Sequence, residues 1–155
     1  MSGSLEVGSK APDFSCAADG DRQISLADYA GKKLVIYFYP KDDTPGCTTE
    51  AIEFTAQAGA FAAANTEIVG VSADSVEKHE KFKAKHNLGV TLLSDPDQKM
   101  LQAYGVWVEK NMYGKKYMGI ERATFLVGED GKILYIWRKV RVKGHVDAVL
   151  ETVGA

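Results

Sequence analysis

The sequence feature that most constrains the fold is an uninterrupted apolar run at residues 34–39, Leu-Val-Ile-Tyr-Phe-Tyr. A strand exposed on one face alternates apolar and polar residues, whereas a continuous apolar run is typical of a strand buried on both faces. Such strands occur in parallel sheets that carry helices on their faces. A second strand of this kind is predicted at residues 67–72, after a helix-forming segment. We therefore predict an α/β protein.

The remaining segments predict a mixed central sheet flanked by helices on both faces. An N-terminal β-hairpin is expected from strands at residues 13–16 and 23–26, joined by a turn at 19–21 and followed by one helical turn at 26–29. Further strands are predicted at residues 91–94, 123–127 and 133–137, the last two joined by a hairpin turn at Asp130-Gly131. Helices are predicted at residues 47–63, 74–87, 95–104 and 145–153. Residues 106–120 are expected to form an irregular excursion with a turn.

The composition excludes several classes of protein. Of 155 residues, 45% are apolar and 26% are charged, and the net charge is −2. A nucleic-acid-binding domain normally carries a basic surplus, which this chain lacks. No apolar run approaches the roughly 20 residues that span a bilayer, so we expect no association with a membrane. One basic cluster is expected to be the solvated end of a strand rather than an anion site: Arg138, Lys139, Arg141 and Lys143.

The N-terminus Met1-Ser2-Gly3-Ser4 has neither the basic region nor the apolar core of a secretory signal, which predicts a cytoplasmic protein. The same four residues are compatible with a cloning remnant, in which case a removed signal would leave no trace. No repeat, low-complexity linker or change of composition divides the chain. We expect a single domain spanning residues 1–155.

Cys47 is the strongest candidate for a reactive group. It follows the buried strand, a Pro45-Gly46 turn and the expected start of a helix. Unpaired backbone N–H groups and the positive end of the helix dipole favour the thiolate form at such a position. The dipole contributes only about 0.3–1 kcal/mol at an exposed site, so further donors are expected from elsewhere in the chain. The alternative is that Cys47 is a small buried apolar residue.

The segment around Cys47 resembles a known family. The pattern Pro40-x-x-x-Thr44-x-x-Cys47 is similar to the peroxidatic-cysteine motif of the peroxiredoxins. Residues 39–50, 8–14 and 119–125 look like the Q-type branch of that family, the bacterioferritin comigratory proteins. The resemblance covers nearly the whole chain.

The resemblance implies a thioredoxin-like fold with added N-terminal structure. It also implies reduction of hydrogen peroxide and organic hydroperoxides without a metal or other cofactor. In this reading Cys47 is the thiolate nucleophile that becomes a sulfenic acid, and Thr44 hydrogen-bonds the peroxide and the thiolate. Pro40 would shield the site from water, and Arg122 would supply the positive charge.

Glu50 lies one helical turn after Cys47, and two roles are open for it. An acid suits a helix N-terminus electrostatically. It could instead orient an arginine, either Arg122 or Arg138. A carboxylate near Cys47 would by itself oppose thiolate formation, so any catalytic benefit would act through the arginine.

The chain departs from the family pattern at the resolving cysteine. Many Q-type members carry this cysteine five positions after the peroxidatic one, which is Ile52 here, and others carry it near what is here Lys83. The only other cysteine is Cys16, which we expect to be a packed small residue. The resemblance therefore implies a 1-Cys cycle, in which an external thiol such as thioredoxin, glutaredoxin or glutathione resolves the sulfenic acid. A monomer or weak dimer is expected.

Other functions are weaker fits to the sequence. A peroxide-sensing relay that passes oxidation to a partner protein would use the same Cys47 chemistry, and only turnover distinguishes the two. A binding or chaperone-like module with a vestigial Cys47 is disfavoured by the intact Thr44 and Arg122. No C-x-x-C pair supports a dithiol oxidoreductase. The three histidines, which are His79, His86 and His145, show no metal-site spacing and are expected at the surface.

Overall fold

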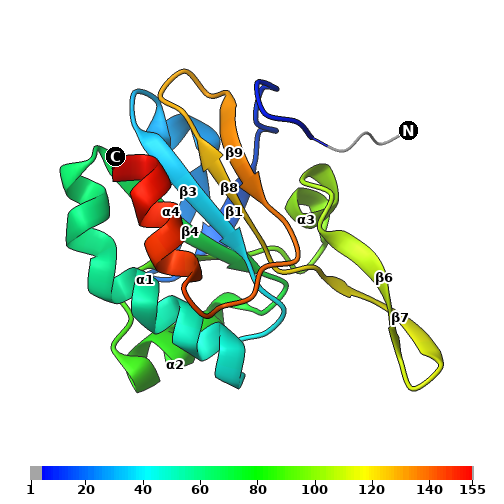
Figure 1. Ribbon diagram of the computed structural model, residues 1–155. Coiled ribbons are helices and arrows are strands. Elements are labelled where there is room, and N and C mark those ends of the chain that lie inside the picture. The colour runs from blue at the N-terminus through cyan, green and yellow to red at the C-terminus, as the bar shows by residue number, and fades with distance from the viewer. Residues whose placement is uncertain (1–4, 155) are drawn as a thin grey trace.

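The computed structural model describes residues 5–154, so the proposed cloning remnant at residues 1–4 lies outside the described residues. A seven-stranded sheet has helices on its two faces, and a two-stranded hairpin projects from one side (Figure 1). The strands are β1 (Ser15–Ala18), β2 (Arg22–Ser25), β3 (Lys33–Phe38), β4 (Thr66–Ser72), β5 (Thr91–Ser94), β6 (Trp107–Met112), β7 (Lys115–Ile120), β8 (Ala123–Val127) and β9 (Ile133–Trp137). The helices are the 3₁₀ turn η1 (Leu26–Tyr29), α1 (Pro45–Ala63), α2 (Val76–His86), α3 (Lys99–Ala103) and α4 (His145–Gly154).

The large sheet has the strand order β2-β1-β5-β4-β3-β8-β9. Strands β3, β4 and β5 are parallel, whereas β8 pairs antiparallel with β3 and β9 antiparallel with β8. The N-terminal hairpin of β1 and β2 continues the sheet, because β1 also pairs with β5. The predicted mixed sheet and the N-terminal hairpin are therefore confirmed, with β1 starting two residues later than expected.

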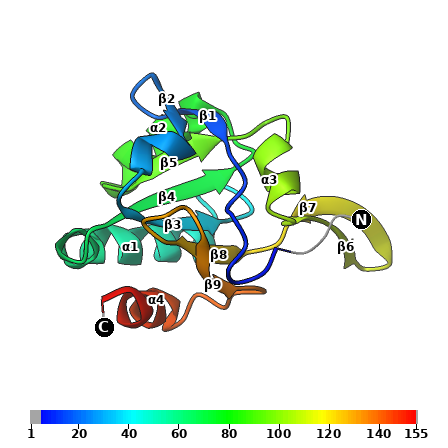
Figure 2. The ribbon, with the colours of Figure 1, turned by 90° about the horizontal axis from the view of Figure 1, so that it is seen from above.

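Strand β3 is buried on both faces, as its apolar run predicts. Leu34, Ile36 and Phe38 belong to the core layer that also holds the inward side of α3. Their neighbours Val35 and Tyr37 belong to a second layer, beneath α1, α2 and α4. Figure 2 shows α1 and α4 together on one side of the sheet and α3 on the other side. The prediction of helices on both faces is confirmed.

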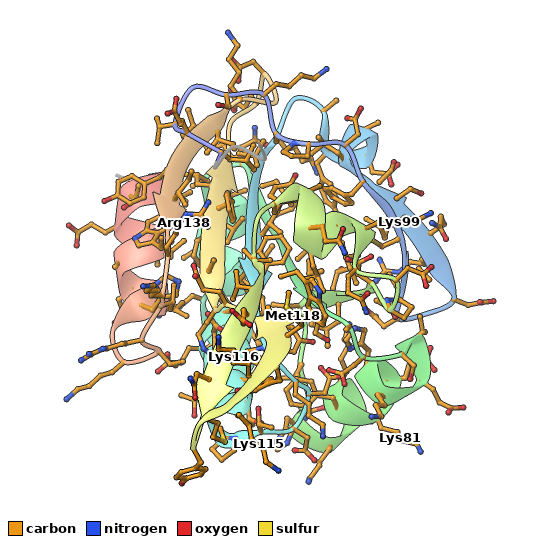
Figure 3. All side chains as sticks on the ribbon, turned by 90° about the vertical axis from the view of Figure 1, so that its right-hand side faces the viewer. Lys81, Lys99, Lys115, Lys116, Met118 and Arg138 are labelled. Atoms are coloured by element: carbon orange, nitrogen blue, oxygen red, sulfur yellow. The ribbon has the colours of Figure 1, made fainter. Side chains whose placement is uncertain are left out.

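The prediction of an irregular excursion at residues 106–120 is wrong. These residues form the antiparallel hairpin β6–β7, and Figure 3 shows Lys115, Lys116 and Met118 along it. The turn residues Tyr113 and Gly114 both have positive φ, at 54° and 80°. A two-residue hairpin turn with positive φ at both centres favours Asn-Gly or Asp-Gly, so a tyrosine at the first position concealed the signal.

The predicted helix at residues 95–104 is also shorter than expected. Helix α3 begins at Lys99, because Gln98 has a left-handed backbone with φ of 59°. The Asp95 carboxylate accepts a hydrogen bond from the backbone N–H of Leu101 at 2.8 Å. Residues 96 and 97 are turn residues that place this carboxylate at the helix start.

The expectation that all histidines lie at the surface is wrong for two of them. His79 has no exposed surface and His145 is 6% exposed, whereas His86 is partly exposed. Each buried ring has polar partners, which makes burial tolerable. His145 Nε2 lies 2.8 Å from the Thr124 hydroxyl oxygen. Single-sequence patterns do not reveal such pairings.

Among residues 5–154, no helix combines the length and the apolar character that crossing a membrane requires. The four residues of the basic cluster lie on the exposed segment at and after the end of β9.

Gly70 on β4 is required by the packing of Tyr37. A Cβ atom at Gly70 would lie 2.6 Å from Cζ of the Tyr37 ring, a distance that real Cβ atoms do not tolerate. Gly70→Ala should therefore lower the free energy of unfolding by about 1–3 kcal/mol, as overpacked cores do. Urea unfolding measures this change. The matched control is Gly59→Ala on exposed α1, where a Cβ meets nothing within 4 Å and should stabilise the helix; equal effects of the two changes would contradict the account.

Candidate active site

The first turn of α1 places Cys47 at the end of strand β3. Thr44 has the extended backbone of an N-cap residue, and Pro45 occupies the first helical position, where its missing N–H costs nothing. The helix thus begins two residues earlier than predicted. Cys47 is its third residue, and only 1% of its surface is exposed.

Arg122 reaches Cys47 from a distant part of the chain. It lies between β7 and β8, and the pairing of β8 with β3 brings Ala123 opposite Phe38. One guanidinium nitrogen, Nη2, donates to Cys47 Sγ at 3.2 Å. Within residues 5–154, no other side chain makes a hydrogen bond to Cys47 Sγ. The structure therefore brings together two of the side chains that the sequence singles out.

Glu50 holds the other arm of the same guanidinium. Arg122 Nη1 donates to Glu50 Oε1 at 2.7 Å, and the Glu50 side chain has no exposed surface. Of the two roles that the sequence leaves open, this contact corresponds to orienting an arginine, and the arginine is Arg122. Arg138 instead lies 3.8 Å from Glu121 Oε2. Its guanidinium lies over the Phe125 ring.

Burial dominates the electrostatics of this pair. Desolvation raises the pKa of the Glu50 carboxyl to about 7, although the charge and hydrogen bond of Arg122 lower it. The pKa of Arg122 is raised, because the charges of Glu50 and Cys47 outweigh its own desolvation. The guanidinium therefore stays charged, while the carboxyl can exchange a proton near neutral pH.

Within residues 5–154, neither of the other two motif residues, Pro40 and Thr44, makes a hydrogen bond to Cys47 Sγ. The Thr44 hydroxyl donates to the backbone carbonyl of Lys41 at 2.8 Å. Pro40 is exposed, in the loop between β3 and α1. Both residues belong to the segment that leads from β3 into the first turn of α1.

Sequence reasoning missed several residues that shape the site. Gly46 leaves room for the guanidinium, since a Cβ there would lie 3.2 Å from Arg122 Nη2; the Pro-Gly turn was the available signal. Tyr37 lies in the same core layer as Cys47 and is fully buried, and desolvation raises its pKa well above the usual value. Burial lowers the pKa of His145 to about 4, with Arg122 adding to the effect. These neutral rings keep the site poorly solvated.

Cys16 is remote from Cys47 in its packing. The two cysteines belong to different core layers, on opposite faces of the sheet. Cys16 Sγ lies 3.9 Å from Met100 Sδ. Desolvation, with a smaller contribution from Asp95, raises the pKa of the Cys16 thiol to about 11. This environment fits a packed residue that stays protonated.

The two family positions for a resolving cysteine are occupied by other side chains. Ile52 is 44% exposed on α1. The Lys83 ammonium donates to Asp19 Oδ2 at 2.7 Å. In the described part of the chain, no group of three or more histidine, cysteine, aspartate or glutamate side chains is arranged to hold a metal ion.

Comparison with known proteins agrees with this site. Residues 7–136 match the AhpC/TSA family. Peroxiredoxin Bcp of Bacillus subtilis is 51% identical over 148 residues, covering 96% of this chain and 94% of the relative. A solved structure of the Xanthomonas campestris bacterioferritin comigratory protein has 47% identity and a TM-score of 0.89, covering 96% and 95% of the two chains. A PrxQ mutant from Xylella fastidiosa has 38% identity and a TM-score of 0.92, covering 97% and 96%.

With this likeness in sequence and in structure, the chain belongs to the AhpC/TSA family, in its Bcp or Q-type peroxiredoxin branch. It is a thiol-dependent peroxidase with the thioredoxin-like peroxiredoxin fold. The resemblance stated from the sequence is confirmed. Peroxiredoxin chemistry requires a peroxide and a thiol reductant.

Glu50 makes stability depend on pH. The unfolded carboxyl releases its proton near pH 4.5, whereas the folded one holds it to about pH 7. Between these pH values the unfolded state therefore binds fewer protons than the folded state. As pH rises through this range, the free energy of unfolding falls by up to about 3 kcal/mol. Glu50→Gln removes this titration. Urea unfolding from pH 4.5 to 7.5 should show the unsubstituted protein losing stability relative to the variant, and parallel profiles would contradict this account.

Proposed function

We propose that Cys47 attacks the peroxide and that Arg122 stabilises the charge that moves during the reaction. The observation that carries this proposal is the 3.2 Å contact between Arg122 Nη2 and Cys47 Sγ, with the guanidinium fixed by buried Glu50. A guanidinium stays protonated and offers several N–H groups in one plane. It can therefore hold the thiolate and a peroxide oxygen at once.

The reaction is a displacement at oxygen. The Cys47 thiolate attacks one peroxide oxygen, the O–O bond breaks, and the second oxygen leaves as an alcohol or water after taking up a proton. Cys47 is oxidised to a sulfenic acid and the peroxide is reduced. Negative charge passes from sulfur to the leaving oxygen, so donors already in place lower the barrier without reorganising. No electron acceptor beyond the peroxide is needed.

Thr44 and Pro40 complete the proposed pocket. The Thr44 hydroxyl, bonded to Lys41 in the peroxide-free site, would turn to the bound peroxide. Pro40 would keep water from the thiolate at the rim. The substrates that we propose are hydrogen peroxide and organic hydroperoxides. The Xanthomonas campestris relative is described by its alkyl peroxide reduction activity, which supports the organic class.

We propose a 1-Cys cycle. An external thiol attacks the Cys47 sulfenic acid, releasing water and forming a mixed disulfide. A second thiol then releases the Cys47 thiol and leaves as the external disulfide. The separation of Cys16 from Cys47 on opposite faces of the sheet supports this cycle. Thioredoxin, glutaredoxin and glutathione are the candidate reductants.

We also propose that residues 1–155 act as one domain, since the family match alone covers residues 7–136. The cytoplasmic location and the monomeric or weakly dimeric state stay predictions from the sequence.

Replacing each cysteine separately tests the 1-Cys cycle. Cys47→Ser should abolish peroxide consumption, because a hydroxyl is not ionised at neutral pH. Cys16→Ser should leave turnover with glutathione or thioredoxin nearly intact, because the cycle does not use Cys16. Steady-state peroxide consumption measures both. Activity without Cys47 would remove it from the mechanism, and loss of recycling without Cys16 would show a 2-Cys cycle. Many turnovers per chain distinguish an enzyme from a relay, which would stop after one.

Removing the guanidinium tests the contact between Arg122 and Cys47 on which the proposal rests. Arg122→Ala should slow the second-order reaction of Cys47 with hydrogen peroxide by about 10²–10³-fold, the usual cost of a lost charge-stabilising donor. Stopped-flow mixing measures this rate. Arg138→Ala is the matched control, because Arg138 lies over Phe125 and near Glu121, away from the sulfur. Equal rates for the Arg122 variant and the control would exclude the proposed role.

A further inference from the structure

A buried aspartate–histidine pair joins the loop before Cys47 to helix α2. It has no part in the proposed reaction of Cys47 with peroxide. Asp42 belongs to the loop between Pro40 and Thr44, and His79 belongs to α2. His79 Nδ1 lies 2.6 Å from Asp42 Oδ2. The side chains are 0% and 5% exposed, respectively. A pair buried to this degree would be costly unless its geometry were well satisfied.

Every side-chain oxygen and nitrogen of this pair has a hydrogen-bond partner in the structure. His79 Nε2 lies 2.9 Å from the backbone carbonyl of Leu93 on β5. The Tyr39 hydroxyl donates to Asp42 Oδ1 at 2.5 Å. The backbone N–H of Asp42 donates to Asp74 Oδ2 at 2.8 Å. One loop residue is thus fixed to the end of β3, to the segment after β4, and through His79 to α2 and β5.

The hydrogen bonds also determine how many protons the pair holds. A carbonyl oxygen only accepts, so His79 Nε2 carries a proton toward Leu93. A second proton must lie between Nδ1 and Asp42 Oδ2, because both atoms would otherwise present lone pairs at 2.6 Å. Two titratable groups bond directly to Asp42: Tyr39, whose pKa burial raises well above its usual value, and Asp74. Several lysines line the adjoining surface, namely Lys41, Lys78, Lys81 and Lys85. Tyr39 is therefore a donor to Asp42, and the pair is held by a shared proton.

The loop fixed in this way leads directly into the first turn of α1. Asp43 has a left-handed backbone with φ of 61°, and the Thr44 hydroxyl bonds back to Lys41, so the chain between Asp42 and Cys47 is short and tightly turned. A shift of Asp42 would therefore move Cys47 relative to Arg122. We propose that the Asp42–His79 pair is a latch that positions the active-site loop and holds Cys47 against Arg122. This proposal rests on the proposed role of Cys47.

The latch has a second consequence for the cycle. Cys47 is 1% exposed, so a thiol larger than a peroxide reaches its sulfur only when the first turn of α1 opens. Asp42 and His79 are positioning residues, which act through the loop and do not touch the reacting atoms. Releasing the latch should slow the attack on peroxide and at the same time expose Cys47 to bulky reagents. General destabilisation would also expose Cys47, so a control variant of lowered stability is needed beside the latch variant.

The test uses the full chain in a Cys16→Ser background, so that Cys47 is the single thiol. His79→Leu removes both ring N–H groups and should slow the reaction with hydrogen peroxide about tenfold or more, because small misplacements of reacting groups are costly. Alkylation of Cys47 by N-ethylmaleimide should become faster. Hydrogen exchange should accelerate at residues 41–48. Stopped-flow mixing, intact mass and exchange mass spectrometry measure the three effects.

Two further variants separate the latch from general destabilisation. Asp42→Asn retains the geometry without the shared proton, since its amide can donate to His79 Nδ1 and its carbonyl can accept from Tyr39. Asp42→Asn should therefore keep most of the peroxide rate of the background, which His79→Leu loses. Lys83→Met lies on the same helix but breaks only the contact with Asp19. It should lower stability in urea without changing the peroxide rate or the alkylation rate.

The proposal is overturned if His79→Leu keeps the peroxide rate of its background. It is also overturned if the peroxide and alkylation rates of His79→Leu and Lys83→Met change alike for an equal loss of stability, or if Asp42→Asn behaves like His79→Leu. These outcomes leave the role of Cys47 untouched. Failure of the proposed function would appear differently, as peroxide consumption that persists in Cys47→Ser.

Discussion

The hydrogen bonds that Arg122 makes with Cys47 and Glu50 join parts of the chain that are more than 70 residues apart. Neither partner holds this position by local structure alone. Cys47 is carried by the first turn of α1, and Arg122 by the residues just before β8, so the contact exists only when β3 and β8 pair in register. Chemistry at Cys47 therefore depends on the completed sheet. A glycine at position 46 provides the space in which the guanidinium lies.

Burial gives this contact its strength and also its cost. A charge-assisted hydrogen bond is stronger in a poorly solvated site than in water. The same desolvation raises the pKa of Glu50 to about 7, so the group that orients Arg122 is itself close to neutralisation. On the other side of the loop, the Asp42–His79 pair is also buried, with 2.6 Å between Asp42 Oδ2 and His79 Nδ1. Two buried polar clusters thus flank the short segment that carries the thiol.

The sequence predicts the fold well where a local pattern reports burial. The apolar run of β3 and the Asp-Gly turn of the β8–β9 hairpin are signals of this kind, and the motif around Cys47 identifies the family. It fails where a residue adopts an unusual backbone for its type, as Tyr113 does in the β6–β7 turn. It also fails where burial depends on distant partners. His79 and His145 read as surface residues, because their partners lie on other elements.

The central claim is that Cys47 is oxidised alone and that an external thiol resolves it. Intact mass spectrometry after one equivalent of hydrogen peroxide, with and without glutathione, tests this claim directly. The account predicts the gain of one oxygen at Cys47 without glutathione and a mixed disulfide at Cys47 when glutathione is limiting. An internal disulfide between Cys16 and Cys47, seen as the loss of two hydrogens without added thiol, would contradict it.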